Sequence, residues 1–134
     1  MNLRQLMRAT LPTPREMAND VRIVQMRKEV TEIDLPVVVA ITRSLPTVLE
    51  PVKRERSTFI LSVEELGPLS QGDVQVSCDC EYFMFYCEYA LNSVGAAEIR
   101  YSNGDVPLMT NPGLQPTLCK HLYKLAGVVT RRNW

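Results

Sequence analysis

The 134-residue sequence has only four cysteines and one histidine, and it has no excess of charge of either sign. Its 15 basic residues balance 15 acidic residues, whereas a dedicated nucleic-acid-binding protein usually has a basic excess. The sequence lacks an apolar run near the ~18 residues that span a membrane. Its first residues, MNLRQLMRATLPTPREM, are too charged for a secretory signal. We therefore expect a chain made in a reducing cytoplasm, where paired cysteines indicate metal binding more often than disulfides.

The chain is long enough for the core of one domain. We predict an N-terminal arm at residues 1–20, a β-rich domain at 21–128 and a C-terminal tail at 129–134. The segment NLRQLMRA predicts two helical turns, after which Pro12 and Pro14 favour an extended connection. Trp134 is a large side chain of a type that often anchors protein interfaces. We expect residues 1–20 and 128–134 to be buried mainly by other chains.

The stretch from residue 21 to residue 76 is rich in β-branched residues and predicts strands. The segments VRIVQMRKEV, LPVVVAIT and STFILSVEEL are bounded by Pro36, Pro46, Pro51 and the turn-like GPLSQGD. The first segment is also compatible with an amphipathic helix, but a strand is favoured. The segment AEIRYSNGDVPLM predicts a hairpin, because Asn-Gly suits a tight turn.

The C-terminal part predicts a helix. Leu118, Leu122, Leu125 and Val129 share one helical face, Thr117 is a suitable N-cap, and Gly127 is a suitable end. The aromatic segment YFMFYCEY upstream predicts a short buried helix or an irregular core segment. The expected fold class is α+β, with a small antiparallel β-sheet and a C-terminal helix.

The cysteines and the histidine form two close pairs, C-x-C and C-x-H. In GDVQVSCDCE, the period of a strand places the side chains of Val74, Val76, Cys78 and Cys80 on one face. Cys119 and His121 fall in the first turn of the predicted final helix. Zinc prefers four tetrahedral nitrogen and sulfur ligands, and Cys3His is a common closed structural site. The residues alone leave open small core cysteines, a core or helix-capping His121, and a ligand role for Cys87, which we expect to be a free buried cysteine.

The pattern C-x-C…C-x-H, with VSCDCEYF and NPGLQPTLCKHL, resembles the SWIM-type zinc finger over residues 70–128. The resemblance implies a zinc-pinned ββα core with a structural Zn²⁺ ion bound by Cys78, Cys80, Cys119 and His121. The segment between the two pairs is longer than in many members of the family. This long form resembles SWIM proteins among the virion structural proteins of tailed bacteriophages. It implies a location in the virion after synthesis in the host cytoplasm, and other virion proteins as partners in a symmetric assembly.

Enzymatic activity is not expected. Four protein ligands leave no open position for water on the metal, and there is no second histidine to act as a base. Asp79 and Glu81 are expected on the opposite face of the strand, away from the metal. Together with the resemblance, this favours a structural or interaction protein of a phage particle, and no membrane partner is expected. The alternative is a nucleic-acid-binding SWIM module that uses the basic residues of the final helix and tail, Lys120, Lys124, Arg131 and Arg132.

Overall fold

The computed structural model describes residues 1–45, 54–64 and 68–134. Four strands form one antiparallel sheet in the order β1-β2-β3-β4, which together with the helices confirms the α+β class. The elements in chain order are α1 (Leu3–Ala9), α2 (Pro12–Met17), the 3-10 turn η1 (Ala18–Asp20), β1 (Val21–Val30), β2 (Pro36–Ser44), β3 (Arg54–Ser62), β4 (Val74–Cys78), the π-helical turn η2 (Phe83–Cys87), α3 (Glu88–Ser93) and α4 (Lys120–Arg131). Among the described residues, no helix has both the length and the apolar character needed to cross a membrane.

The strands lie close to where the β-branched pattern predicts them. β1 covers VRIVQMRKEV, so the strand and not the helix is correct for this segment. β2 begins at Pro36, where a missing N–H does not interrupt the sheet. Pro46, Pro51 and Gly67, which were expected to bound the strands, lie outside the described residues, as do residues 65 and 66 at the end of the predicted strand STFILSVEEL.

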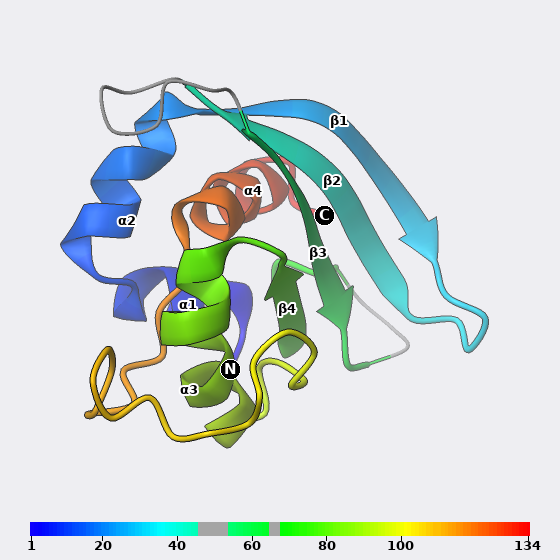
Figure 1. The fold of residues 1–134 in the computed structure, drawn as a ribbon. Coiled ribbons are helices and arrows are strands. Elements are labelled where there is room, and N and C mark those ends of the chain that lie inside the picture. The colour runs from blue at the N-terminus through cyan, green and yellow to red at the C-terminus, as the bar shows by residue number, and fades with distance from the viewer. Residues whose placement is uncertain (46–53, 65–67) are drawn as a thin grey trace.

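The core lies between the sheet and α4. Figure 1 shows β1, β2 and β3 curving around α4, with α1 and α2 on the other side of this helix. Val38, Ile60 and Val76 are neighbours in register across three strands and are almost completely buried. They face the predicted apolar residues Leu118, Leu122, Leu125 and Val129, which are all 0% exposed. Burial of each such leucine contributes roughly 2 kcal/mol, so this face of α4 and Leu118 just before it are a main source of stability.

The N-terminal segment packs on this core, contrary to the expectation that other chains bury it. In α1, Asn2 and Gln5 form a capping box, and Leu3 and Leu6 are both 0% exposed and belong to the main core cluster. The extended connection predicted after α1 is also wrong, because α2 begins at Pro12. Proline is well tolerated in the first turn of a helix, where its missing N–H would have no intrahelical partner.

Two threonines join the N-terminal helices to the segment before α4. The N–H of Leu118 donates to Thr10 Oγ1 at 3.0 Å, and the N–H of Leu11 donates to Thr117 Oγ1 at 3.1 Å. Thr117 is therefore not the N-cap of α4; the cap position is held by Cys119. These bonds connect positions more than 100 residues apart, which explains why local spacing did not predict them.

The C-terminal residues also pack on their own chain. α4 does not end at Gly127 but continues to Arg131, because Ala126 and Val129 on either side of the glycine are buried in the core. Trp134 is partly buried against the core cluster. The division of the chain at residues 20 and 128 remains a prediction. Leu3, Leu6 and Val129 are buried by this chain, whereas Arg131, Arg132 and Asn133 are exposed.

The predicted hairpin around Asn103 and Gly104 is absent, and residues 97–109 form no strand. Instead, Glu88 of α3 holds this segment. Its Oε1 accepts hydrogen bonds from three consecutive backbone N–H groups, at 3.0, 2.9 and 2.9 Å, from residues Arg100, Tyr101 and Ser102. These donors are then unavailable to a partner strand, which is the physical reason that the hairpin does not form. The aromatic segment upstream is helical, as predicted, but it is buried only in part, because Phe83 is 0% exposed whereas Phe85 is 59% exposed.

Candidate metal centre

The fold brings the two predicted pairs together. The side-chain ligand atoms of Cys78, Cys80, Cys119 and His121 all lie within 4.8 Å of one another. All four residues are at most 4% exposed. The cluster could therefore hold a metal ion, which is consistent with the sequence-based expectation.

Two elements position the ligands. Cys78 is the last residue of β4, and Cys80 follows in the turn that leads to η2. Cys119 is the N-cap of α4, and His121 lies in the first turn of that helix. Because α4 packs on the inner face of the sheet, its first turn meets the end of β4. The C-x-C pair and the C-x-H pair are thus held by core packing and not by local sequence.

One distance in the cluster is close to that of a tetrahedral site. Cys78 Sγ lies 3.8 Å from Nδ1 of His121. Tetrahedral zinc with a sulfur ligand at about 2.3 Å and a nitrogen ligand at about 2.0–2.1 Å would separate these two atoms by about 3.6 Å. The N–H of Phe83 donates to Cys80 Sγ at 3.3 Å, an interaction that favours a thiolate. The three sulfurs and one ring nitrogen match the donor preference of zinc.

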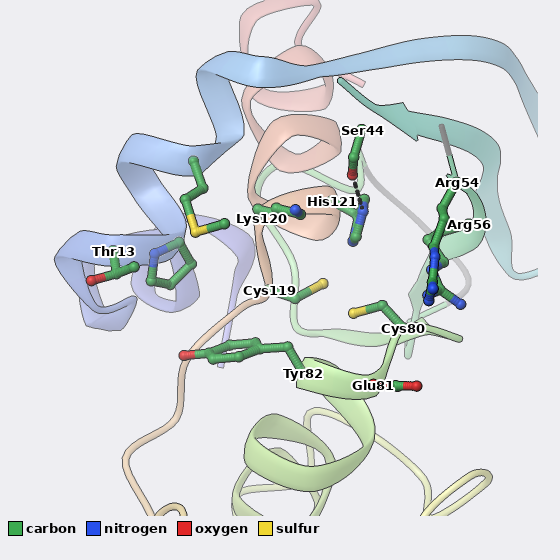
Figure 2. Close-up of a pocket in the computed structure, with 12 residues that line it drawn as sticks. Thr13, Ser44, Arg54, Arg56, Cys80, Glu81, Tyr82, Cys119, Lys120 and His121 are labelled. Atoms are coloured by element: carbon green, nitrogen blue, oxygen red, sulfur yellow. Dashed lines mark hydrogen bonds between the residues drawn. The ribbon is translucent and has the colours of Figure 1, made fainter. Parts of the chain in front are cut away.

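Ser44 orients the histidine and was not predicted from the sequence. Its Oγ lies 2.9 Å from Nε2 of His121 (Figure 2). If Nδ1 binds a metal ion together with the three sulfurs, the ring proton lies on Nε2 and is donated to Ser44 Oγ. Hydrogen bonds of this kind fix the tautomer and the ring orientation of metal-binding histidines. No local motif indicates Ser44, because it reaches His121 only through the pairing of β2 and the packing of α4.

Removal of the Ser44 hydroxyl should weaken metal binding. We expect Ser44→Ala to lower the zinc affinity by about 10- to 100-fold, as loss of an outer hydrogen bond typically does. Competition with a chromophoric chelator measures this affinity. The matched control is Ser62→Ala, which removes a buried hydroxyl from the other end of the sheet. Equal affinities for the two variants would show that Ser44 does not orient the ligand.

The three thiols differ in how readily they ionise. Hydrogen bonds from Cys119 and Cys78 hold the pKa of Cys80 far below its ordinary value, in spite of its burial. Burial raises the pKa of Cys119 well above its ordinary value. A hydrogen bond with Cys119 lowers the pKa of Cys78, but a hydrogen bond to Cys80 and burial outweigh it, so this pKa is also raised. The directions of these pKa shifts make Cys80 the thiol that ionises most readily, whereas Cys78 and Cys119 favour the protonated form.

Metal binding should release these protons. Cysteine binds metals as the thiolate, so Cys78 and Cys119 must each lose a proton, and roughly two protons should be released per zinc ion. Their raised pKa values keep both thiols protonated through the neutral range. The association constant should therefore rise about 100-fold per pH unit between about pH 7 and pH 8. Calorimetry in buffers of different ionisation enthalpy counts the protons, and a count near zero would contradict this charge distribution.

Other candidate residues lie outside the cluster. Cys87 is completely buried, and burial raises its pKa, as expected for a free core cysteine. Asp79 accepts a hydrogen bond from the N–H of Ser57 at 3.1 Å. Glu81 lines a pocket that also touches Cys80 and Cys119. Glu81 is exposed and is not part of the cluster, and Figure 2 shows its carboxylate directed away from Cys119 and His121.

The chain was compared with protein families, curated proteins and solved structures. No family model, curated protein or solved structure matches this chain. The resemblance to SWIM-type fingers thus depends on the four clustered residues and their spacing. What the structure supports is a buried Cys3His cluster that could hold a metal ion and is consistent with a zinc finger.

Proposed function

We propose that this chain is a structural and interaction protein built on a structural zinc site. The observation that carries this proposal is the buried cluster of Cys78, Cys80, Cys119 and His121. A bound zinc ion would link the end of β4 to the start of α4. Four protein ligands would complete its coordination, which is typical of a structural site and not of a catalytic one. We therefore propose no enzymatic activity.

An exposed apolar surface supports a role in protein interactions. Five large apolar side chains of η2 and the segment 101–109 are exposed, here called the apolar patch: Phe85 59%, Tyr101 42%, Val106 45%, Leu108 71% and Met109 95%. The patch is held in place, because Thr110 Oγ1 donates to the carbonyl of Phe85 and Glu88 binds the start of the segment. Contiguous apolar side chains on a soluble surface typically mark an interaction site.

The resemblance to SWIM-type zinc fingers of phage virion proteins suggests where this interaction takes place. We propose that the chain is a SWIM-like component of a tailed-bacteriophage virion, where it assembles symmetrically with copies of itself and with other virion proteins. Mass spectrometry of particles purified from lysed host cells tests this location. A fixed copy number of the chain per particle would support it. Absence of the chain from purified particles, with presence in the soluble lysate, would contradict it.

The patch allows a direct test of self-association. Light scattering of the zinc-loaded chain should show an oligomer, and Leu108→Glu with Met109→Glu should convert it to a monomer without loss of zinc. Ile33→Glu is the matched control, because Ile33 is 69% exposed on the connection between β1 and β2, outside the patch. A wild-type monomer at all concentrations, or equal dissociation by the control, would contradict assembly through the patch.

The alternative is a nucleic-acid-binding module. Arg131 and Arg132 are exposed at the end of α4, and Lys124 is partly exposed on the same helix. These charges are few for an affinity that depends mainly on phosphate contacts. A salt titration of binding to duplex DNA tests this alternative, which requires a measurable affinity that falls steeply with salt.

A further inference from the structure

A pocket of about 270 Å³ opens beside the cysteine and histidine cluster. It lies between α2, the first turn of α4, the start of β3 and the turn before η2 (Figure 2). Cys80, Cys119 and His121 form part of its wall. The structural role of the cluster does not use this space.

One side of the pocket is cationic. Arg54 and Arg56 alternate with Glu55 on β3, and their register with Ser44 and Thr42 places them on the inner face of the sheet. Lys120, the first residue of α4, also lines the pocket, and Figure 2 shows it apart from the two arginines, with His121 between them. Among the described residues that line the pocket, Glu81 is the single carboxylate. None of the three cations forms an ion pair with a carboxylate in the described ranges, so the pocket has an excess of positive charge.

The other side is apolar and aromatic. Figure 2 shows Arg54 and Arg56 across the pocket from Thr13 and the ring of Tyr82. Tyr82 stacks on Tyr86 with a centroid distance of 4.9 Å and an interplanar angle of 9°, which fixes the orientation of its ring. Pro14 and Met17 of α2 complete this wall. The pocket thus combines positive charge with an apolar, aromatic wall.

The start of α4 adds hydrogen-bond donors. The N-cap Cys119 makes no side-chain bond to the first turn of this 12-residue helix. The first N–H groups of a helix have no intrahelical partner and favour an anion. These N–H groups would add to the attraction that the three cations exert on an anion.

We propose that this pocket binds the phosphate group of a nucleotide, with Arg54, Arg56 and Lys120 around the phosphate and Tyr82 against the base. A guanidinium group can donate two parallel hydrogen bonds to two oxygens of one phosphate. Three cations and the carboxylate of Glu81 give the pocket wall a net charge of about +2, which matches a phosphate dianion better than a ligand with one negative charge. The space left beside the phosphate leads to the aromatic wall, and bases stack well on such rings. The site does not depend on the virion assignment.

A different role for the arginines would be to offset the negative charge of the thiolates. Three thiolates around a divalent ion have a net charge of −1, whereas the two arginines and Lys120 together have a charge of +3. If the arginines served only to neutralise the cluster, their replacement would change the zinc affinity, and neither the wild-type chain nor any variant would bind phosphate. Zinc affinity is therefore measured alongside nucleotide binding.

The test is a calorimetric titration of the zinc-loaded chain with inorganic phosphate and with adenosine 5′-monophosphate. We expect saturable binding of both ligands, with tighter binding of the nucleotide. Arg56→Ala, and independently Arg54→Ala, should weaken both ligands by at least about tenfold. Tyr82→Ala should weaken the nucleotide and leave inorganic phosphate unchanged. Arg22→Ala, an exposed arginine on β1 outside the pocket, is the matched control and should change neither.

Two further ligands separate the sources of the anion. A short single-stranded oligonucleotide with a 5′-phosphate that binds as tightly as the mononucleotide would identify a strand end as the ligand, and weaker binding would identify a free nucleotide. An acidic peptide without phosphate that binds more tightly than the nucleotide would overturn the proposal. So would the absence of saturable nucleotide binding by the folded, zinc-loaded chain, or an equal loss of binding in Arg22→Ala.

Discussion

Replacement of Cys119 by serine is expected to lower the stability of the zinc-loaded chain by about 5 kcal/mol or more. Structural zinc contributes about 10–16 kcal/mol in zinc-finger peptides, because the ligands meet only in the folded state. Cys119 is completely buried and joins α4 to the cysteines of β4. Serine would remove one of the four ligands and leave a buried hydroxyl in its place. Thermal melting with and without a chelator measures the loss.

The control for this experiment is Cys87→Ser, which also buries a hydroxyl at a completely buried position. This variant should lower the stability by only about 1–3 kcal/mol. The difference in stability between zinc-loaded and chelated protein should stay as large as in the wild-type chain. Cys119→Ser should lose most of that difference. Equal behaviour of the two variants would mean that Cys87 belongs to the site or that the metal site does not exist.

Leu6→Ala is expected to lower the free energy of unfolding by about 2–5 kcal/mol, the usual range for removal of a buried leucine side chain. Leu6 is 0% exposed in the core cluster although it lies in the segment first interpreted as an arm. The bonds between Thr10 and Leu118 and between Leu11 and Thr117 fix this segment on the body. Urea denaturation of the zinc-loaded chain measures the change.

The matched control is Arg4→Ala, which shortens an exposed side chain in the same helix α1. Alanine is favourable in a helix, so this variant should change stability by less than about 0.5 kcal/mol. A small effect of Leu6→Ala, similar to that of Arg4→Ala, would show that α1 is detached from the core in solution. The segment would then be free to contact other chains, as the sequence first suggested.

Periodicity predicted the main elements of the fold. Alternation marked β4, the spacing of Leu122, Leu125 and Val129 marked α4, and β-branched composition favoured a strand over a helix for β1. These patterns are local, and each reports which face of an element is buried. The C-x-C and C-x-H pairs were likewise readable because each pair has a short, specific spacing.

Features that depend on distant contacts were missed. The prolines at positions 12 and 14 favour an extended chain in isolation, but they fall in the first turn of α2, where proline is tolerated. Asn103-Gly104 suits a hairpin, but Glu88 takes the backbone donors that a strand would need. Gly127 did not end α4, because the residues around it are buried.

In the candidate site, too, local patterns were predicted and distant contacts were missed. The sequence predicted the four residues of the cluster but not the partner of His121, since Ser44 lies 77 positions away. It also missed Arg54 and Arg56, which reach the pocket only because β3 pairs with β2 in one particular register. The spacing of residues within one element could be predicted, whereas the juxtaposition of three elements could not.

The most direct test of the zinc assignment is X-ray absorption spectroscopy at the zinc edge, combined with elemental analysis of the native protein. The proposed site predicts one zinc ion per chain with three sulfur ligands at about 2.3 Å and one nitrogen ligand at about 2.0–2.1 Å. A folded chain without zinc, or a zinc ion surrounded mainly by oxygen ligands, would contradict a structural site at Cys78, Cys80, Cys119 and His121.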